Sequence, residues 1–273
     1  FFLFVTGTIL YLSQRMTSGN VNFHNVGAKE SLFMGLGQAC AILPGLSRSG
    51  TTIAAGLVIG LDKEFAAKFS FILSIPFSYI IYSIISLESE FIGSLAFCLL
   101  LLIPLLYYSN WDYSLLFHKP TKNELILAFL MFIGYMAYST VVGVLLDGTG
   151  TGGSGLANSF TIHLESIVSL VFSMMGEELL KFIPLMFFMR LFYKYTNNRN
   201  LSIAISSVII LTCFGLLHYE PPYSTLISVL ALQGLGSMFE LYGYIRTKNL
   251  LVPYISHLLT DALVFILIFS GIA

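Results

Sequence analysis

Long apolar runs, most of them about as long as a bilayer is thick, dominate the chain. They lie at 65–86, 91–108, 123–146, 163–190, 201–217, 223–245 and 250–272. A helix of about 20 apolar residues crosses the hydrocarbon core of a membrane. The pattern therefore predicts an all-α, polytopic bundle of about 8 spanning helices, a fold that satisfies its backbone polar groups internally.

The stretch 31–61 departs from this pattern. Two short apolar arms flank a break at Pro44–Gly50, and each arm is too short to cross a bilayer. Non-helical backbone at membrane depth is tolerated where it is buried in protein or lines a wet cavity. We therefore expect a re-entrant helical hairpin here in addition to the spans.

Composition and charge agree with a membrane location. The chain is 56% hydrophobic and only 10% charged, against about 25% charged residues in soluble domains. The net charge of −1 gives no electrostatic reason to expect a nucleic-acid partner. Lys and Arg gather in alternate loops, which the positive-inside rule places in the cytoplasm; they are Lys63, Lys68, Lys119, Lys122, Arg190, Lys194, Arg199, Arg246 and Lys248.

The break in the hairpin carries chemistry suited to a phosphate. Its residues Ser47, Arg48, Ser49, Gly50 and Thr51 combine a guanidinium, three hydroxyls and free backbone N–H groups. An arginine at membrane depth is costly and marks a candidate functional site. Guanidinium forks match phosphate oxygens, and helix N-termini bind anions. The interpretation that remains beside this one is a buried structural arginine.

Three segments together resemble the second half of undecaprenyl-diphosphate phosphatase, the BacA-type membrane enzyme. They are Val5-Thr6-Gly7, the stretch from Gly35 to Gly50 with its PGLSRSG core, and Ala66 to Pro76. The resemblance implies hydrolysis of a polyprenyl diphosphate to the monophosphate, with Arg48 and Ser47 holding the diphosphate. It also implies a bacterial cytoplasmic (inner) membrane as the location.

The resemblance has one gap, at the acid–base group. The family has an earlier inverted repeat with a Glu-rich re-entrant segment, and at the equivalent position this chain has Gln38, which cannot act as a base. The chain begins with Phe1 and its first apolar run is short, so we expect that residues preceding it are missing. Either those residues supply the catalytic group, or the cradle binds without turnover.

The second half carries ionisable residues on three apolar segments. Glu177 and Glu178 are adjacent, His218 ends the next segment, and His257 and Asp261 stand four residues apart on one helix face. Buried ionisable groups stabilise one another only where they converge. Two mechanisms remain open: Glu177 as general base to a water, or a divalent metal such as zinc bound by His218, His257 and Asp261, with Glu177 as base.

These motifs resemble the CPBP family of CAAX-processing and bacteriocin-processing intramembrane proteases, whose pattern is EExxxR, FxxxH and HxxxN/D. The chain departs from it at Phe182, which stands where the basic residue is expected, while Lys181 comes one place earlier. The resemblance implies a peptide or protein substrate in the membrane. Alternatively, Glu178 with Lys181 and His257 with Asp261 are structural pairs, and His218 and Glu240 are interfacial or structural residues.

We therefore predict a diphosphatase-like segment at 1–108, a connector at 109–122 and a CPBP-like protease domain at 123–273. The predicted function is a bacterial cell-envelope hydrolase that joins a polyprenyl-diphosphate phosphatase-like half to an intramembrane protease half. The alternative is a non-catalytic lipid-diphosphate-binding or scaffold protein with a pseudo-protease half. A transporter is a third interpretation, because broken helices also form transport sites.

Overall fold

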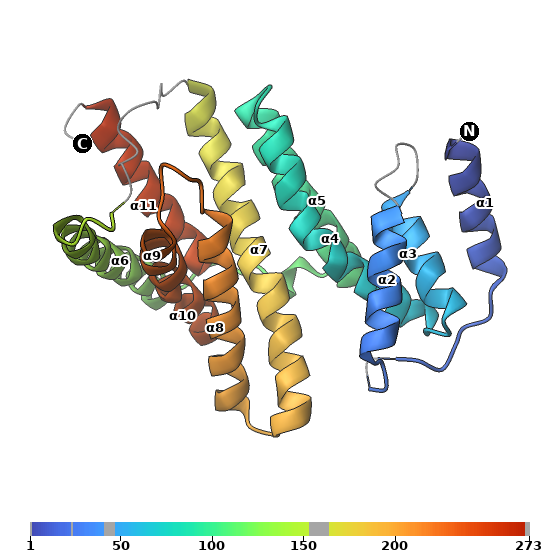
Figure 1. The fold of residues 1–273 in the computed structure, drawn as a ribbon. Helices are drawn as coiled ribbons and strands as arrows, with labels where there is room; N and C mark the ends of the chain where they lie inside the picture. The colour runs from blue at the N-terminus through green and yellow to red at the C-terminus, as the bar shows by residue number, and fades with distance from the viewer. Residues whose placement is uncertain (1, 23, 41–46, 153–163, 271–273) are drawn as a thin grey trace. The chain divides into compact units, whose positions relative to one another are not determined.

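The computed structural model describes residues 2–22, 24–40, 47–152 and 164–270, and within them no strand is formed. Its elements, drawn in Figure 1, are α1 (Phe2–Arg15), α2 (Ala28–Cys40), α3 (Arg48–Val58), α4 (Lys63–Ile85), α5 (Glu90–Tyr108), η1 (Tyr113–Leu115), α6 (Lys122–Gly148), α7 (Leu164–Thr196), α8 (Arg199–Leu217), α9 (Leu226–Val229), η3 (Leu230–Gly234), η4 (Leu235–Ser237), α10 (Met238–Thr247) and α11 (Leu251–Phe269).

The predicted all-α membrane fold is confirmed. Within the described residues, five helical stretches are long and apolar enough to cross a membrane: Lys63–Ile85, Glu90–Tyr107, Lys122–Gly148, Arg199–Leu217 and Leu226–Thr247. Each matches one of the apolar runs in the sequence to within a few residues. The chain divides into two compact units, Phe1–Ile80 and Ile81–Ala273.

In the first unit, α2 and α3 correspond to the two arms expected for the re-entrant hairpin. They have 13 and 11 residues, too few to span, and they pack against each other. Small residues allow this close approach, because a Cβ atom placed on Gly37 would lie 2.5 Å from the Cβ atom of Ala55. Residues 41–46, which hold part of the predicted break, lie outside the described residues.

A polar turn fastens the start of α4 to the segment after α1. Gly60 adopts a φ of +86°, and a Cβ atom on Gly19 would lie 1.8 Å from the Gly60 carbonyl oxygen, so both positions require glycine. Asp62 caps α4 by accepting from the Phe65 N–H and also accepts from the Ser18 hydroxyl. These two bonds hold the pKa of the Asp62 carboxyl below its ordinary value.

Gln38 has a structural role in the first unit. Its side-chain amide donates to the Leu73 carbonyl oxygen at 2.8 Å and ties α2 to α4. The amide N–H group is needed for this bond, because a carbonyl can only accept. Gln38, which was predicted to stand at the position of the family's acidic residue, therefore holds two helices together.

We expect Gln38→Glu to destabilise the first unit by about 1–3 kcal/mol, because an ionised carboxylate would face the Leu73 carbonyl with no donor between them. Thermal unfolding of the detergent-solubilised protein measures this. Gln38→Met, which removes the bond without placing two acceptors together, is the matched control and is expected to lose less. Equal midpoints for Gln38→Glu and the unchanged protein would contradict the structural role of this amide.

In the second unit, α7 packs against α5 on one side and α8 on the other (Figure 1). Gly176 permits the close approach to α5, since a Cβ atom there would lie 2.4 Å from Cδ1 of Phe97. The starts of α5 and α7 are joined by the Ser89 hydroxyl, which donates to Glu165 at 2.6 Å, and by the Ser166 hydroxyl, which donates to Glu90 at 2.6 Å. Together these contacts fix α7 within the unit.

The apolar run at 223–245, expected as one span, forms one continuous helical stretch whose winding changes along its length. It begins with α9, widens into a π-helical turn at Leu230–Gly234, tightens at Leu235–Ser237 and continues as α10. Two glycines from different helices lie close together at the π-helical turn, because a Cβ atom on Gly215 of α8 would lie 3.0 Å from the Cα atom of Gly234. Such π-helical turns are frequent at functional sites.

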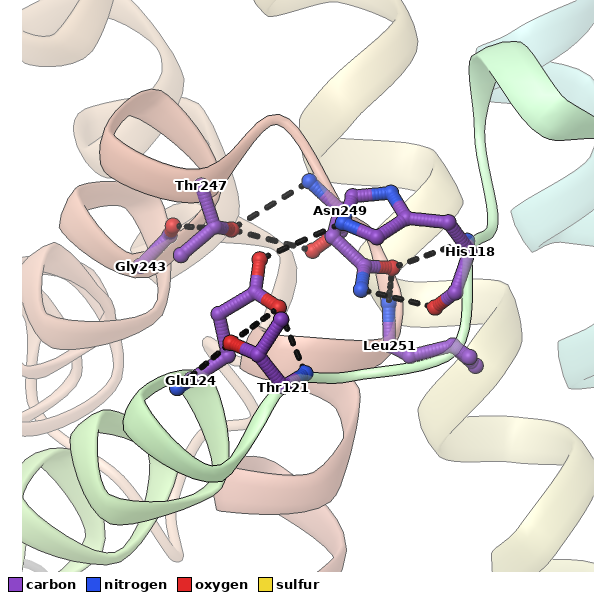
Figure 2. Close-up of polar contacts among 7 residues, drawn as sticks. All are labelled: His118, Thr121, Glu124, Gly243, Thr247, Asn249 and Leu251. Atoms are coloured by element: carbon purple, nitrogen blue, oxygen red, sulfur yellow. Dashed lines mark hydrogen bonds and ion pairs between the residues drawn. The ribbon is translucent and has the colours of Figure 1, made fainter.

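The end of the predicted connector is anchored to the turn between α10 and α11. The Asn249 side chain is fully buried; its amide donates to the His118 carbonyl oxygen at 2.9 Å, and its own oxygen accepts from the Leu251 N–H at 3.1 Å (Figure 2). The Leu250 N–H also donates to the Leu116 carbonyl oxygen at 2.9 Å. These bonds join the connector to the second unit, which begins at Ile81, before α5. The predicted protease domain, by contrast, begins at residue 123.

Candidate active site

The second unit holds a buried ion-pair cluster contributed by three helices. Glu178 of α7 lies 2.8 Å from the Nδ1 atom of His257 of α11, and both side chains are buried. Lys181, one turn after Glu178, places its Nζ atom 2.6 Å from the same Glu178 oxygen, Oε1. Glu178 thus accepts from two partners at the centre of the cluster.

Glu240 of α10 completes this cluster. Its carboxylate lies 2.5 Å from the Nζ atom of Lys181, and only 4% of the residue is exposed. Lys181 is 2% exposed and bridges the carboxylates of Glu178 and Glu240, which lie on different helices. The ammonium group also lies over the Phe214 ring, 4.6 Å from its centroid. A buried charge requires such compensation, because its desolvation is otherwise too costly.

The neighbours of His257 assign its ring nitrogens. A carboxylate beside a lysine is ionised and can only accept, so Nδ1 carries the hydrogen and donates to Glu178. The other nitrogen, Nε2, lies 3.9 Å from Glu177 Oε2 and 4.0 Å from Asp261 Oδ2. These gaps exceed a hydrogen bond, and each has a length that one bridging oxygen atom would span. Glu177, His257 and Asp261 thus face one position where water or a substrate oxygen would bind.

His218, predicted to join the same site, caps the end of α8. Its Nδ1 atom lies 2.9 Å from the Phe214 carbonyl oxygen and its ring packs against the Phe214 ring. Within the described residues, no ion pair links His218 to Glu177 or His257. Phe214 nevertheless contacts both His218 and Lys181, so the end of α8 adjoins the cluster. A catalytic role for His218 stays a prediction.

The side chains suggest a metal set that differs from the predicted one. Glu178, Glu240 and His257 can each offer one ligand atom, all within 4.8 Å of one another. The Lys181 ammonium, however, already contacts both carboxylates. A divalent cation would have to displace this lysine, so these residues do not fit a resident metal. A metal site formed by His218, His257 and Asp261 stays a prediction.

In the first unit, the predicted phosphate-binding residues lie at the start of α3. Ser47 is the N-cap, and its hydroxyl accepts from the Gly50 N–H at 3.3 Å. The Thr51 hydroxyl donates to the Ser47 carbonyl oxygen at 2.8 Å. Arg48 and Ser49 form the first turn, whose N–H groups have no acceptor four residues earlier in the helix. The side chain of Arg48 lies outside the described part.

Comparison with known proteins finds two family models, one for each part of the chain, and the first extends beyond the predicted boundary at 122/123. The family model for BacA, the bacitracin resistance protein, matches residues 1–146, and that for Rce1-like type II CAAX prenyl endopeptidases matches residues 159–263. The motifs of the sequence are thereby confirmed as those of these two families. The Rce1-like match includes Glu177, Glu178, His218, His257 and Asp261.

Individual relatives match a short part of the chain. The undecaprenyl-diphosphatase of Methanobrevibacter smithii is 88% identical over 76 residues, which cover 28% of this chain and 27% of that protein. Those of Methanosphaera stadtmanae and Carboxydothermus hydrogenoformans are 49% identical over 75 residues and 50% identical over 72 residues, again covering about a quarter of each chain. The matched part spans about a quarter of the length of these curated relatives. No solved structure matches the chain.

Proposed function

Because the chain belongs to the BacA family of bacitracin resistance proteins, we propose a multi-pass membrane hydrolase with two sites. The first unit holds the diphosphate of a polyprenyl lipid at the start of α3, and the second hydrolyses a peptide bond of a substrate in the membrane. The membrane of residence is the cytoplasmic membrane. The observation that carries the peptidase proposal is the ordered set of Glu177, Glu178 and His257.

In the peptidase site, Glu177 is the general base. It removes a proton from a water molecule, whose oxygen bonds to the carbonyl carbon of the substrate. The carbon–nitrogen bond then breaks, and the proton passes to the leaving amine. His257, held by Glu178 through Nδ1, faces the reacting oxygen with Nε2 and orients it. Burial strengthens these electrostatic contacts.

In the first unit, the anion site combines the Arg48 guanidinium with the N–H groups that open α3. A guanidinium binds phosphate through two parallel hydrogen bonds, and a helix N-terminus supplies further donors. Gln38, bonded to Leu73, provides no base. Residues 1–273 assayed alone should therefore bind a polyprenyl diphosphate and release little phosphate.

We expect Arg48→Ala to weaken binding of a polyprenyl diphosphate by about tenfold or more, because charge-assisted hydrogen bonds are lost. Arg48→Lys should also bind more weakly, since it keeps the charge without the fork. Binding is measured by titration of the lipid onto protein in nanodiscs, and phosphate release is followed separately as the measure of turnover. Lys29→Ala, an exposed cation of the same unit, is the matched control.

Two results would overturn parts of this proposal. Unchanged lipid binding by Arg48→Ala would remove the anion site. Phosphate release at an enzymatic rate that is lost on Arg48→Ala would show that the catalytic group is present despite Gln38. A protein that binds the lipid but cleaves no peptide would favour the scaffold alternative.

A further inference from the structure

A second polar site lies away from the ion-pair cluster, where α6 begins and α10 ends. An open hollow of about 490 Å³ is formed there between the connector and these two helices. Its polar lining comes from His118, Thr121, Asn123, Glu124, Arg246 and Thr247. All of these residues belong to the second unit, and none takes part in the proposed hydrolysis.

The acidic residue of this hollow is already engaged. One Glu124 oxygen accepts from the Thr121 N–H at 2.8 Å while the Glu124 N–H donates to the Thr121 hydroxyl, and these two bonds form the capping box of α6 (Figure 2). The same Glu124 oxygen also accepts from the Thr121 hydroxyl at 2.9 Å. The other Glu124 oxygen lies 3.2 Å from the Nε2 atom of His118. The carboxylate therefore faces the helix start and the imidazole, and its charge is largely compensated.

Arg246 is the cation that remains. It is exposed, and among the residues that the structure describes no carboxylate lies within ion-pair distance of it. The first-turn N–H groups of Lys122 and Asn123 also have no acceptor within α6. A guanidinium, an imidazole edge and helix-start N–H groups that share one hollow favour an oxygen-rich anion.

The location of the hollow selects the kind of anion. Three lysines are close in the sequence to the residues that line the hollow: Lys119, Lys122 and Lys248. By the positive-inside rule, the start of α6 and the end of α10 therefore lie at the cytoplasmic surface. The exposed rings of Trp111 and Tyr113, in the same connector, suit the headgroup level of a bilayer. Basic hollows between helices at this level bind lipid headgroups.

The site is formed before any ligand arrives. Buried Asn249 holds the backbone of His118 against the turn after α10, and the Thr247 hydroxyl donates to the Gly243 carbonyl oxygen at 2.8 Å (Figure 2). The loop that carries His118 and the helix end that carries Arg246 are thus fixed to each other. Binding here would cost little ordering of the chain.

We propose that this hollow binds the phosphate of an anionic membrane lipid, with the Arg246 guanidinium as the principal ligand. The N–H groups of Lys122 and Asn123 at the start of α6 donate the remaining hydrogen bonds. The residues of this site differ from those of the diphosphate cradle at α3, and its occupant binds at the membrane surface on the second unit.

The test compares lipid binding by Arg246→Gln and by the unchanged full chain in detergent, using native mass spectrometry with phosphatidic acid as the probe. We expect Arg246→Gln to weaken phosphatidic acid binding about tenfold or more, because a bidentate charge-assisted contact is lost. Arg246→Lys should fall in between. Arg190→Gln removes an exposed arginine from the same predicted side of the membrane, so it controls for diffuse charge.

Three results would overturn the proposal. Arg246→Gln binding phosphatidic acid as tightly as the unchanged protein would remove the ligand role of Arg246. Equal losses for Arg246→Gln and Arg190→Gln would indicate diffuse attraction without a site. Inorganic phosphate binding in an Arg246-dependent manner, with phosphatidic acid unable to displace it, would assign the hollow to a free anion. Normal melting temperatures for these surface variants keep the comparison valid.

Discussion

Glu177→Gln is expected to lower peptide-bond hydrolysis by about a hundredfold to ten-thousandfold, because the amide cannot accept a proton from water and a general base contributes this much. The fold should be unaffected, since the ion pairs of the cluster join Glu178, Lys181 and Glu240 and do not depend on Glu177. Single-turnover cleavage of a membrane-embedded peptide by the purified full chain measures the effect. Glu88→Gln, an exposed carboxylate of the same unit, is the control.

Double variants test whether Glu177 and His257 act together in one site. If Glu177 and His257 act as a unit, Glu177→Gln combined with His257→Ala should lose little more activity than either alone. The same comparison with His218→Ala tests the predicted third member. Chelators should leave the activity unchanged if Glu177 and His257 activate the water without a metal. Loss of activity on chelation, restored by zinc, would instead favour the predicted metal mechanism.

Lys181→Met is expected to destabilise the second unit by about 3–5 kcal/mol, the usual effect of breaking a buried ion pair by removing one partner. The substitution leaves the carboxylates of Glu178 and Glu240 buried without the ammonium that lies 2.6 and 2.5 Å from them. Thermal unfolding in detergent measures this loss. The departure from the family pattern at Phe182 is thus accommodated, since a lysine one position earlier still reaches its acidic partners.

A second substitution tests the electrostatic cause. Lys181→Met combined with Glu240→Gln removes one of the two uncompensated carboxylates, so the double variant should be more stable than Lys181→Met alone. Glu240→Gln by itself should cost less than Lys181→Met, because Lys181 keeps Glu178 as its partner. A double variant that loses the sum of the two single effects would show that packing, and not charge, accounts for the loss.

Hydrophobic pattern was sufficient to predict the helices, because each span is a continuous apolar run closed by polar loops. At 223–245 it predicted the span, which the structure forms at Leu226–Thr247, but it did not predict the widened turn at Leu230–Gly234. At this widened turn, Gly234 lies close to Gly215, which belongs to a different helix. The spacing of residues within one apolar run cannot predict such a contact between two helices.

The candidate site could be predicted in part. The motifs identified Glu177, Glu178, His257 and Asp261, which the structure brings together. They missed Glu240, which was interpreted as interfacial or structural, and its bond to Lys181. A signal was present, since a carboxylate inside an apolar run needs a partner. The partner itself could not be predicted, because it lies 59 residues away, on another helix.

The buried Asn249 has a practical consequence for dividing the chain. A protein cut at 122/123, the boundary that the motifs suggest, would lose the backbone of His118 and leave the Asn249 amide buried without its acceptor. It would also lose α5, against which Gly176 packs. A shortened protein intended to isolate the proposed peptidase should therefore begin before Ser89, so that it retains both α5 and the loop of His118 together with the candidate site.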